Sequence, residues 1–171
     1  KELSQYAGVS VAAIKALIDK NIFIQSEKIV SRLKIDDIPL AANFELSTAQ
    51  QVAYEAINES LKTKNCVLLK GVTSSGKTLI YIRLIEQVIQ KNQQALLLLP
   101  EIGLTTQLIN RLRKHFGNKI GVYHSKFSDN ERVECWNHVA DGSYQVILGT
   151  RSSIFLPFQQ LGVIIVDEEH D

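Results

Sequence analysis

Several features that define whole classes of proteins are rare or missing in this chain of 171 residues. Its two cysteines, Cys66 and Cys135, are too few for the disulfide framework of a small secreted protein. It has no run of about 18 apolar residues, and its N-terminus lacks the basic, apolar and cleavage-site series of a secretory signal. The sequence therefore favours a reduced, cytoplasmic compartment and no membrane association.

Methionine is also absent, and the chain runs from Lys1 to Asp171, which closely follows an apolar stretch. Because a domain rarely ends at such a point, we expect the chain to be part of a longer protein. The net charge is +1, but four of the 18 acidic residues lie within the last five positions, so the remainder holds 19 basic and 14 acidic side chains. This mild excess permits a polyanionic partner without requiring one.

From Ser47 onward, short continuous apolar runs alternate with amphipathic stretches, a pattern typical of buried parallel strands joined by helices. Ser47 with Gln50, and Ser128 with Glu131, match the capping box that begins a helix. The pattern predicts an α/β fold with a doubly wound sheet, whose ligands bind beyond the carboxyl ends of the strands. The expected strands are residues 66–69, 95–99, 120–123, 145–148 and 163–166.

Residues 1–40 follow a different pattern. Ser10 is expected to cap a helix in which Ile14, Leu17 and Ile18 share one face. Residues 23–32 then match a small hairpin, as in the wing of a winged-helix module, although a helical hairpin without a DNA role explains the segment equally well. We predict a partial winged-helix DNA-binding domain with a linker over 1–40, and an α/β lobe over 41–171.

The segment GVTSSGKT, residues 71–78, matches the P-loop pattern and stands between an apolar run and an amphipathic helix. Its glycines let successive amides surround phosphate oxygens, Lys77 would neutralise the β and γ phosphates, and Thr78 would hold Mg²⁺. The alternative is a glycine turn that precedes Lys and Thr by chance. The predicted ATP contacts from this loop are Gly71, Thr73, Ser74, Ser75, Gly76, Lys77 and Thr78.

A second motif, VIIVDEEHD, places carboxylates at the end of an apolar run, as a Walker B element does. Asp167 is expected to hold Mg²⁺ directly or through water, and Glu168 to polarise the attacking water. An acidic loop that closes a strand would be the better interpretation without the P-loop. Lys77, Asp167 and Glu168 are therefore the predicted catalytic residues.

Five segments, in order and spacing, resemble the first helicase lobe of the PriA-type replication-restart helicases of superfamily 2. The resemblance is specific from about Leu46 to Asp171, and weaker over 1–40, which are similar to the end of that family's winged-helix domain. It implies a RecA-like lobe, truncated after the Walker B motif. The family usually has glycine where Ser74 stands, from which we expect a modest loss of loop flexibility. The five segments are residues 71–78, 97–107, 122–132, 147–158 and 161–171.

The resemblance also implies roles for single residues. Gln50 matches a glutamine that reads the adenine edge, although the capping box explains it equally well. His170 would relay the nucleotide state toward a second motor lobe. The residues similar to motifs that touch the backbone of single-stranded DNA are Thr105, Gln107, Thr150, Arg151 and Ser152, with an ordinary surface loop as the alternative.

The implied activity of the complete protein is that of an ATP-dependent 3′–5′ DNA helicase acting at stalled forks, with ATP and Mg²⁺ as cofactors. Its implied partners are single-stranded and fork DNA, other primosome proteins and single-stranded-DNA-binding protein. We expect the chain alone to hydrolyse ATP negligibly. The alternatives are another superfamily 2 translocase, a small-molecule P-loop kinase and a non-catalytic DNA-binding module. No zinc is expected, because His124, Cys135 and His138 lack a fourth ligand and a second close pair.

Overall fold

The structure is a computed structural model that describes residues 8–20, 22–23, 44–72, 75–100, 103–124 and 127–167. The chain divides into two compact units, Lys1–Arg32 and Leu33–Asp171. Among the described residues, no helix combines the length and the apolar character that crossing a membrane requires.

The first unit contains helix α2, Val11–Asp19, which begins as its sequence predicts. The Ser10 hydroxyl accepts a hydrogen bond from the Ala13 amide at 3.2 Å, and Ile14, Leu17 and Ile18 are the side chains of this helix that are partly buried. The hairpin predicted over 23–32 lies outside the described residues apart from Phe23, so the winged-helix assignment remains a prediction.

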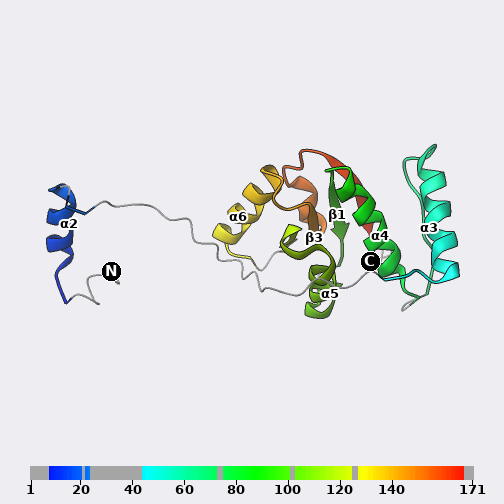
Figure 1. Ribbon diagram of the computed structural model, residues 1–171, viewed down its shortest axis with the longest axis horizontal. Helices are drawn as coiled ribbons and strands as arrows, with labels where there is room; N and C mark the ends of the chain where they lie inside the picture. The colour runs from blue at the N-terminus through cyan, green and yellow to red at the C-terminus, as the bar shows by residue number, and fades with distance from the viewer. Residues whose placement is uncertain are drawn as a thin grey trace. The chain divides into compact units, whose positions relative to one another are not determined.

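The second unit is built on a parallel sheet in the order β2-β3-β1-β4. Leu98 is in register with Gly149 on one side and Val166 on the other, so three strands end at the same level. Whatever follows these strands is brought to one edge of the sheet. The strands are β1 (Gln94–Leu98), β2 (Ile120–Tyr123), β3 (Val146–Gly149) and β4 (Leu161–Val166) (Figure 1).

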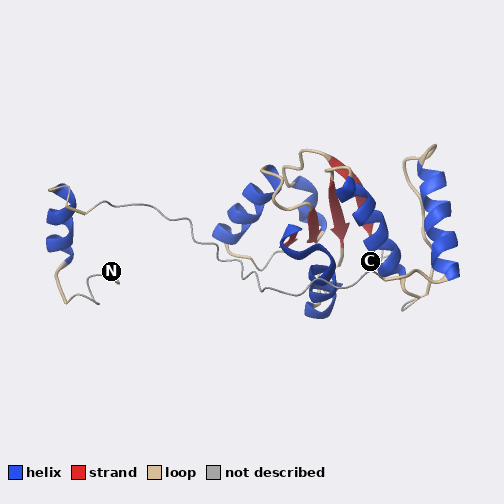
Figure 2. Ribbon diagram, viewed as in Figure 1, coloured by secondary structure: helices blue, strands red, loops and turns tan. Residues whose placement is uncertain are grey.

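Helices precede or connect these strands (Figure 2). The capping boxes predicted at Ser47 and Ser128 are both present, because in each case the serine side chain and the residue three positions on bond to one another's backbone amide. The helices of this unit are α3 (Thr48–Leu61), α4 (Lys77–Gln90), α5 (Thr106–Phe116) and α6 (Asp129–Ala140), with short 3-10 turns η2 (Gly117–Lys119) and η3 (Arg151–Phe155).

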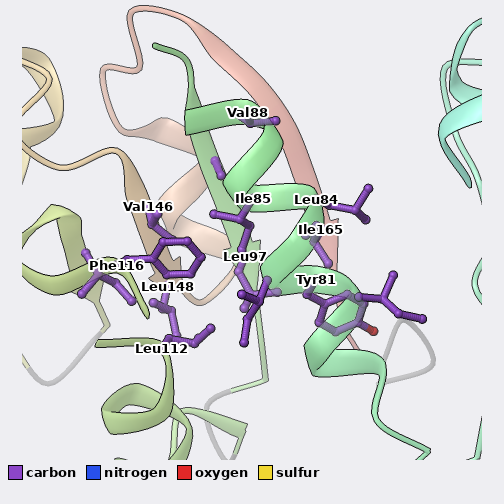
Figure 3. Packing of buried hydrophobic residues seen from close by; sticks show 14 of the residues in the cluster. Tyr81, Leu84, Ile85, Val88, Leu97, Leu112, Phe116, Val146, Leu148 and Ile165 are labelled. Atoms are coloured by element: carbon purple, nitrogen blue, oxygen red, sulfur yellow. The ribbon is translucent and has the colours of Figure 1, made fainter. Parts of the chain in front are cut away.

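Strands β1 and β3 bury both of their faces, as a doubly wound sheet requires, whereas most of β4 is exposed. Along β1, Ala95 and Leu97 pack with residues of α4 and α5, whereas Leu96 between them packs with Cys135 and Val139 of α6. Figure 3 shows α4 side chains interleaved with those of β1, β3 and β4 on the first face. Helices therefore cover both faces, and the predicted α/β fold class is confirmed.

One predicted strand is wrong. Residues 66–69 are not part of the described sheet, and Cys66, which we expected to be buried, is exposed. Val67 and Leu69 are partly buried against the core, while Leu68 is 71% exposed. The physical reason is that apolar residues alone do not specify hydrogen-bond pairing: residues 66–69 pair with neither β2 nor β4, the strands at the two edges of the described sheet.

Candidate active site

The start of α4 gives the P-loop its anion-binding geometry. Gly76 precedes the helix with φ of +82°, a left-handed conformation that glycine adopts without a steric penalty. Gly76 has no side chain that could cap the helix, and the helix dipole adds partial positive charge at the first turn. Lys77 and Thr78 occupy that first turn. The arrangement suits a phosphate group.

The Lys77 ammonium folds back over the beginning of the loop. Its Nζ donates to the Gly71 carbonyl at 2.8 Å and to the Val72 carbonyl at 3.3 Å, while the Ser75 amide donates to the Val72 carbonyl at 3.2 Å. Phosphate oxygens carry a full charge and are stronger acceptors than these carbonyls. The ammonium is therefore held at the loop by bonds that a nucleotide can replace.

Gln50 joins α3 to the same loop. Its Oε1 accepts from the Ser47 amide at 3.0 Å, completing the capping box, and its Nε2 donates to the Gly76 carbonyl at 3.5 Å, near the limit for a hydrogen bond. The capping explanation for Gln50 is thus confirmed. The contact with Gly76 also places this amide beside the P-loop, so the adenine contact remains a prediction.

Asp167 lies where β4 ends and is held from two sides. Its amide donates to the Leu98 carbonyl at 3.0 Å, which continues the pairing of β4 with β1. Its Oδ1 accepts a 2.9 Å hydrogen bond from the Tyr81 hydroxyl. Tyr81 lies on α4, four residues after Lys77, so this bond connects the P-loop helix directly to the Walker B carboxylate.

Tyr81 was missed in the sequence. A tyrosine among the apolar residues of an amphipathic helix is normally assigned to the core, and Tyr81 is indeed 7% exposed. The hydroxyl group was the one clue in the sequence to a further role, because a buried tyrosine hydroxyl usually has a hydrogen-bond partner. The identity of that partner could not be inferred from local sequence.

The residues predicted to contact DNA follow neighbouring strands. The Thr105 hydroxyl caps α5, and Gln107 is exposed in the first turn of that helix. After β3, the Thr150 and Ser152 hydroxyls lie 3.3 Å apart, and Arg151 is exposed. Because β1 and β3 are adjacent and in register, both groups follow the edge of the sheet that also carries Asp167.

The cysteine and histidines considered for zinc have other contacts. Cys135 is buried, its thiol lies 3.8 Å from the Val122 carbonyl, and burial, reinforced by the Glu134 charge, raises its pKa to about 12. The His138 ring packs on Tyr144, with ring centroids 4.8 Å apart. No group of three potential metal ligands from His, Cys, Asp and Glu occurs in the described part of the chain. Magnesium needs no such group, because it binds through one or two carboxylates together with nucleotide phosphates.

Four of the predicted site residues lie outside the described residues, namely Thr73, Ser74, Glu168 and His170.

Comparison with known proteins decides the family. Residues 48–171 match the family model described as DEAD/DEAH box helicase. The chain belongs to this helicase family. This match also disfavours the small-molecule kinase alternative, which shared the P-loop with the helicase interpretation.

Among DEAD/DEAH box helicases, the chain is similar to the replication restart protein PriA, so the predicted resemblance is confirmed. It is 39% identical to PriA of Bacillus subtilis (strain 168), covering 99% of this chain and 22% of that protein. It is 42% identical to PriA of Synechocystis sp., covering 95% of this chain and 20% of that protein. The chain therefore spans about a fifth of the length of these curated relatives.

A solved structure supports the fold independently. A chain from the structure of RecG bound to a three-way DNA junction superposes with a TM-score of 0.64 and 24% identity, covering 75% of this chain and 19% of that one. At that identity the likeness concerns the fold alone. Together with the family match, it identifies the second unit as a RecA-like helicase lobe of superfamily 2.

Proposed function

We propose that this chain is the ATP-binding lobe of a DNA helicase that unwinds DNA at stalled forks so that replication can restart. The observation that supports the proposal most directly is the hydrogen bond from Tyr81, on the helix that begins with Lys77, to the Asp167 carboxylate after β4. The relatives named replication restart protein PriA support the restart role. In the complete protein, ATP hydrolysis would drive movement along single-stranded DNA.

Lys77 would leave the loop carbonyls to neutralise the β and γ phosphates, while the first-turn amides of α4 hold phosphate oxygens. The Thr78 hydroxyl and the Asp167 carboxylate are hard oxygen donors, which fit Mg²⁺. Bound Mg²⁺ would supply positive charge that neutralises the phosphate oxygens. Glu168 would polarise the attacking water, and Gln50 would contact adenine with the hydrogen-bonding capacity that the capping box leaves free.

The DNA-contact role is proposed for the two groups that follow β1 and β3. Hydroxyls, amides and one guanidinium suit phosphate oxygens, which fix the position of a strand without reading its sequence. The same proposal includes a winged-helix remnant over 1–40 and His170 as a relay to a second lobe. It also includes a cytoplasmic location, and primosome proteins and single-stranded-DNA-binding protein as partners. The proposed strand contacts are Thr105, Gln107, Thr150, Arg151 and Ser152.

The lobe by itself should hydrolyse ATP negligibly. Phosphoryl transfer depends on charge stabilisation from several directions, and an arginine from another surface commonly contributes about 10³- to 10⁵-fold. In this helicase class that arginine would come from a second lobe. Turnover by the isolated chain near the rate of the complete protein would contradict the proposal.

Lys77→Ala in the full-length protein tests the proposal. We expect DNA-stimulated ATP hydrolysis, measured by phosphate release, to be abolished, while binding of a forked DNA, measured by fluorescence anisotropy, is retained. Lys91→Ala is the matched control, because Lys91 is an exposed lysine at the opposite end of α4. If Lys77→Ala also abolishes fork binding, the proposed division between nucleotide and DNA contacts is wrong.

A further inference from the structure

The Tyr81 hydroxyl on the P-loop helix bonds to the carboxylate of Asp167, the residue that directly follows β4. We propose that Tyr81 is a positioning residue that orients the Asp167 carboxylate for Mg²⁺. Its hydroxyl donates to Oδ1 at 2.9 Å, which leaves Oδ2 for the ion or for a water molecule bound to it. This inference rests on the proposed role of Asp167 as a magnesium ligand.

The Tyr81 ring is fixed by packing. It belongs to the buried cluster formed by α4 and the sheet, together with Ile85, Leu97 and Ile165. In Figure 3 the ring lies among the labelled apolar side chains, with its oxygen at the edge of the group. A ring held in this way has little rotational freedom, so its hydroxyl stays at one place relative to β4.

The backbone of Asp167 is fixed as well, because its amide continues the ladder between β4 and β1. The remaining freedom is rotation about χ1 and about the terminal χ2 torsion of the carboxyl group, which has a broad energy profile. A hydrogen bond to one oxygen restricts that rotation. Tyr81 therefore restricts the side-chain torsions that decide where the second oxygen points.

The position of Tyr81 on α4 also suits this role. Lys77 precedes it by four residues and Thr78 by three, spacings that place side chains on adjacent turns of one face, with Cβ atoms about 5–6 Å apart. The carboxylate that Tyr81 holds is thus kept near the turn that would carry the phosphates. A neutral hydroxyl adds no positive charge that would compete with the metal ion.

The test compares Tyr81→Phe with Tyr54→Phe in the full-length protein. Tyr54 is a matched control, since its hydroxyl also bonds a side-chain oxygen across helices, Oε1 of Gln87 at 3.3 Å, away from Asp167. The readout is equilibrium binding of a fluorescent ADP analogue as Mg²⁺ is titrated. Tyr81→Phe should raise the half-saturating Mg²⁺ concentration about 3- to 10-fold, as expected for the loss of one ordinary hydrogen bond. Binding in EDTA should not change.

Asp167→Asn separates the two proposals. If it leaves the Mg²⁺ requirement unchanged, the proposed magnesium role of Asp167 fails. If Asp167→Asn changes the requirement but Tyr81→Phe behaves like Tyr54→Phe, the positioning role alone is overturned. Adding Tyr81→Phe to Asp167→Asn should have no further effect on the Mg²⁺ titration, because the group that Tyr81 positions is then no longer a carboxylate. A simple additive effect would show that Tyr81 acts through general stability.

Discussion

The side-chain amide of Gln50 lies against Gly76, at the place where any β-carbon on residue 76 would stand. The same amide donates to the Gly76 carbonyl at 3.5 Å and caps α3 through the Ser47 amide. Gly76 is therefore constrained twice, by its φ of +82° and by the Gln50 amide, which would have to shift to admit a β-carbon.

Gly76→Ala should destabilise the chain by more than a left-handed conformation alone explains. Gly142 provides the control, because its φ is +79° and an added β-carbon there would meet nothing within 4 Å. We expect Gly142→Ala to cost about 1–2 kcal/mol. Gly76→Ala should cost about 1 kcal/mol more, for the capping bond that is lost. Urea unfolding measures both; equal costs would mean that Gln50 does not constrain position 76.

Gln94 is a buried amide that should be needed for stability. It is 4% exposed, its Nε2 donates to the carbonyls of Val139 at 2.9 Å and Tyr144 at 3.0 Å, and its Oε1 accepts from the Gln159 amide at 2.8 Å. Gln94→Leu would remove these three hydrogen bonds to backbone groups, at a cost of about 2–4 kcal/mol.

Gln90→Leu is the control for that measurement, because Gln90 is an exposed residue at the end of α4. It should change the free energy of unfolding by no more than about 0.5 kcal/mol. Similar effects of the two substitutions in chemical denaturation would show that the Gln94 bonds add no net stability.

His115 should make folding sensitive to mild acid. Its pKa lies below its ordinary value of 6.5, mainly because burial disfavours the charged form, with Arg111 and Arg83 acting in the same direction and Glu86 opposing them. The unfolded chain then binds a proton more readily than the folded chain does. The contribution of His115 to the free energy of unfolding is fully present above pH 6.5. It is lost as the pH falls from there toward the lower pKa that His115 has in the folded chain.

Unfolding free energies measured from pH 7.5 down to pH 5 would check this dependence. His115→Asn should flatten the curve below pH 6.5 relative to the unsubstituted chain. Glu86→Gln should steepen it, since Glu86 is the group that opposes the lowering. A curve that His115→Asn leaves unchanged would exclude His115 as the source.

The two cysteines should differ in reactivity. Cys66 is exposed, whereas Cys135 is buried and its pKa is raised to about 12, so it carries almost no thiolate near neutral pH. Titration of the folded chain with a thiol reagent at pH 8 should modify one thiol rapidly and the second after unfolding. Cys66→Ser should remove the rapid phase. Two rapid phases in the folded chain would contradict the burial of Cys135.

Short sequence patterns were sufficient to predict many of the helices and strands. The capping boxes at Ser47 and Ser128 start helices where expected, and residues 120–123 form a strand with the predicted bounds. These features depend on neighbouring residues, so the chain encodes them within a few positions. Residues 66–69 show the limit of this reasoning, because they are apolar but pair with no strand of the described sheet, and strand pairing depends on residues far away in the sequence.

The sequence by itself determined the P-loop, the carboxylate at Asp167 and the helicase family, since each follows from residue types at fixed spacing. Only the tertiary structure decided which side chains meet. Gln50 contacts Gly76 across 26 positions, and Tyr81 contacts Asp167 across 86. Such pairs arise from the packing of a helix against a sheet edge and from strand register, which no short stretch of sequence specifies.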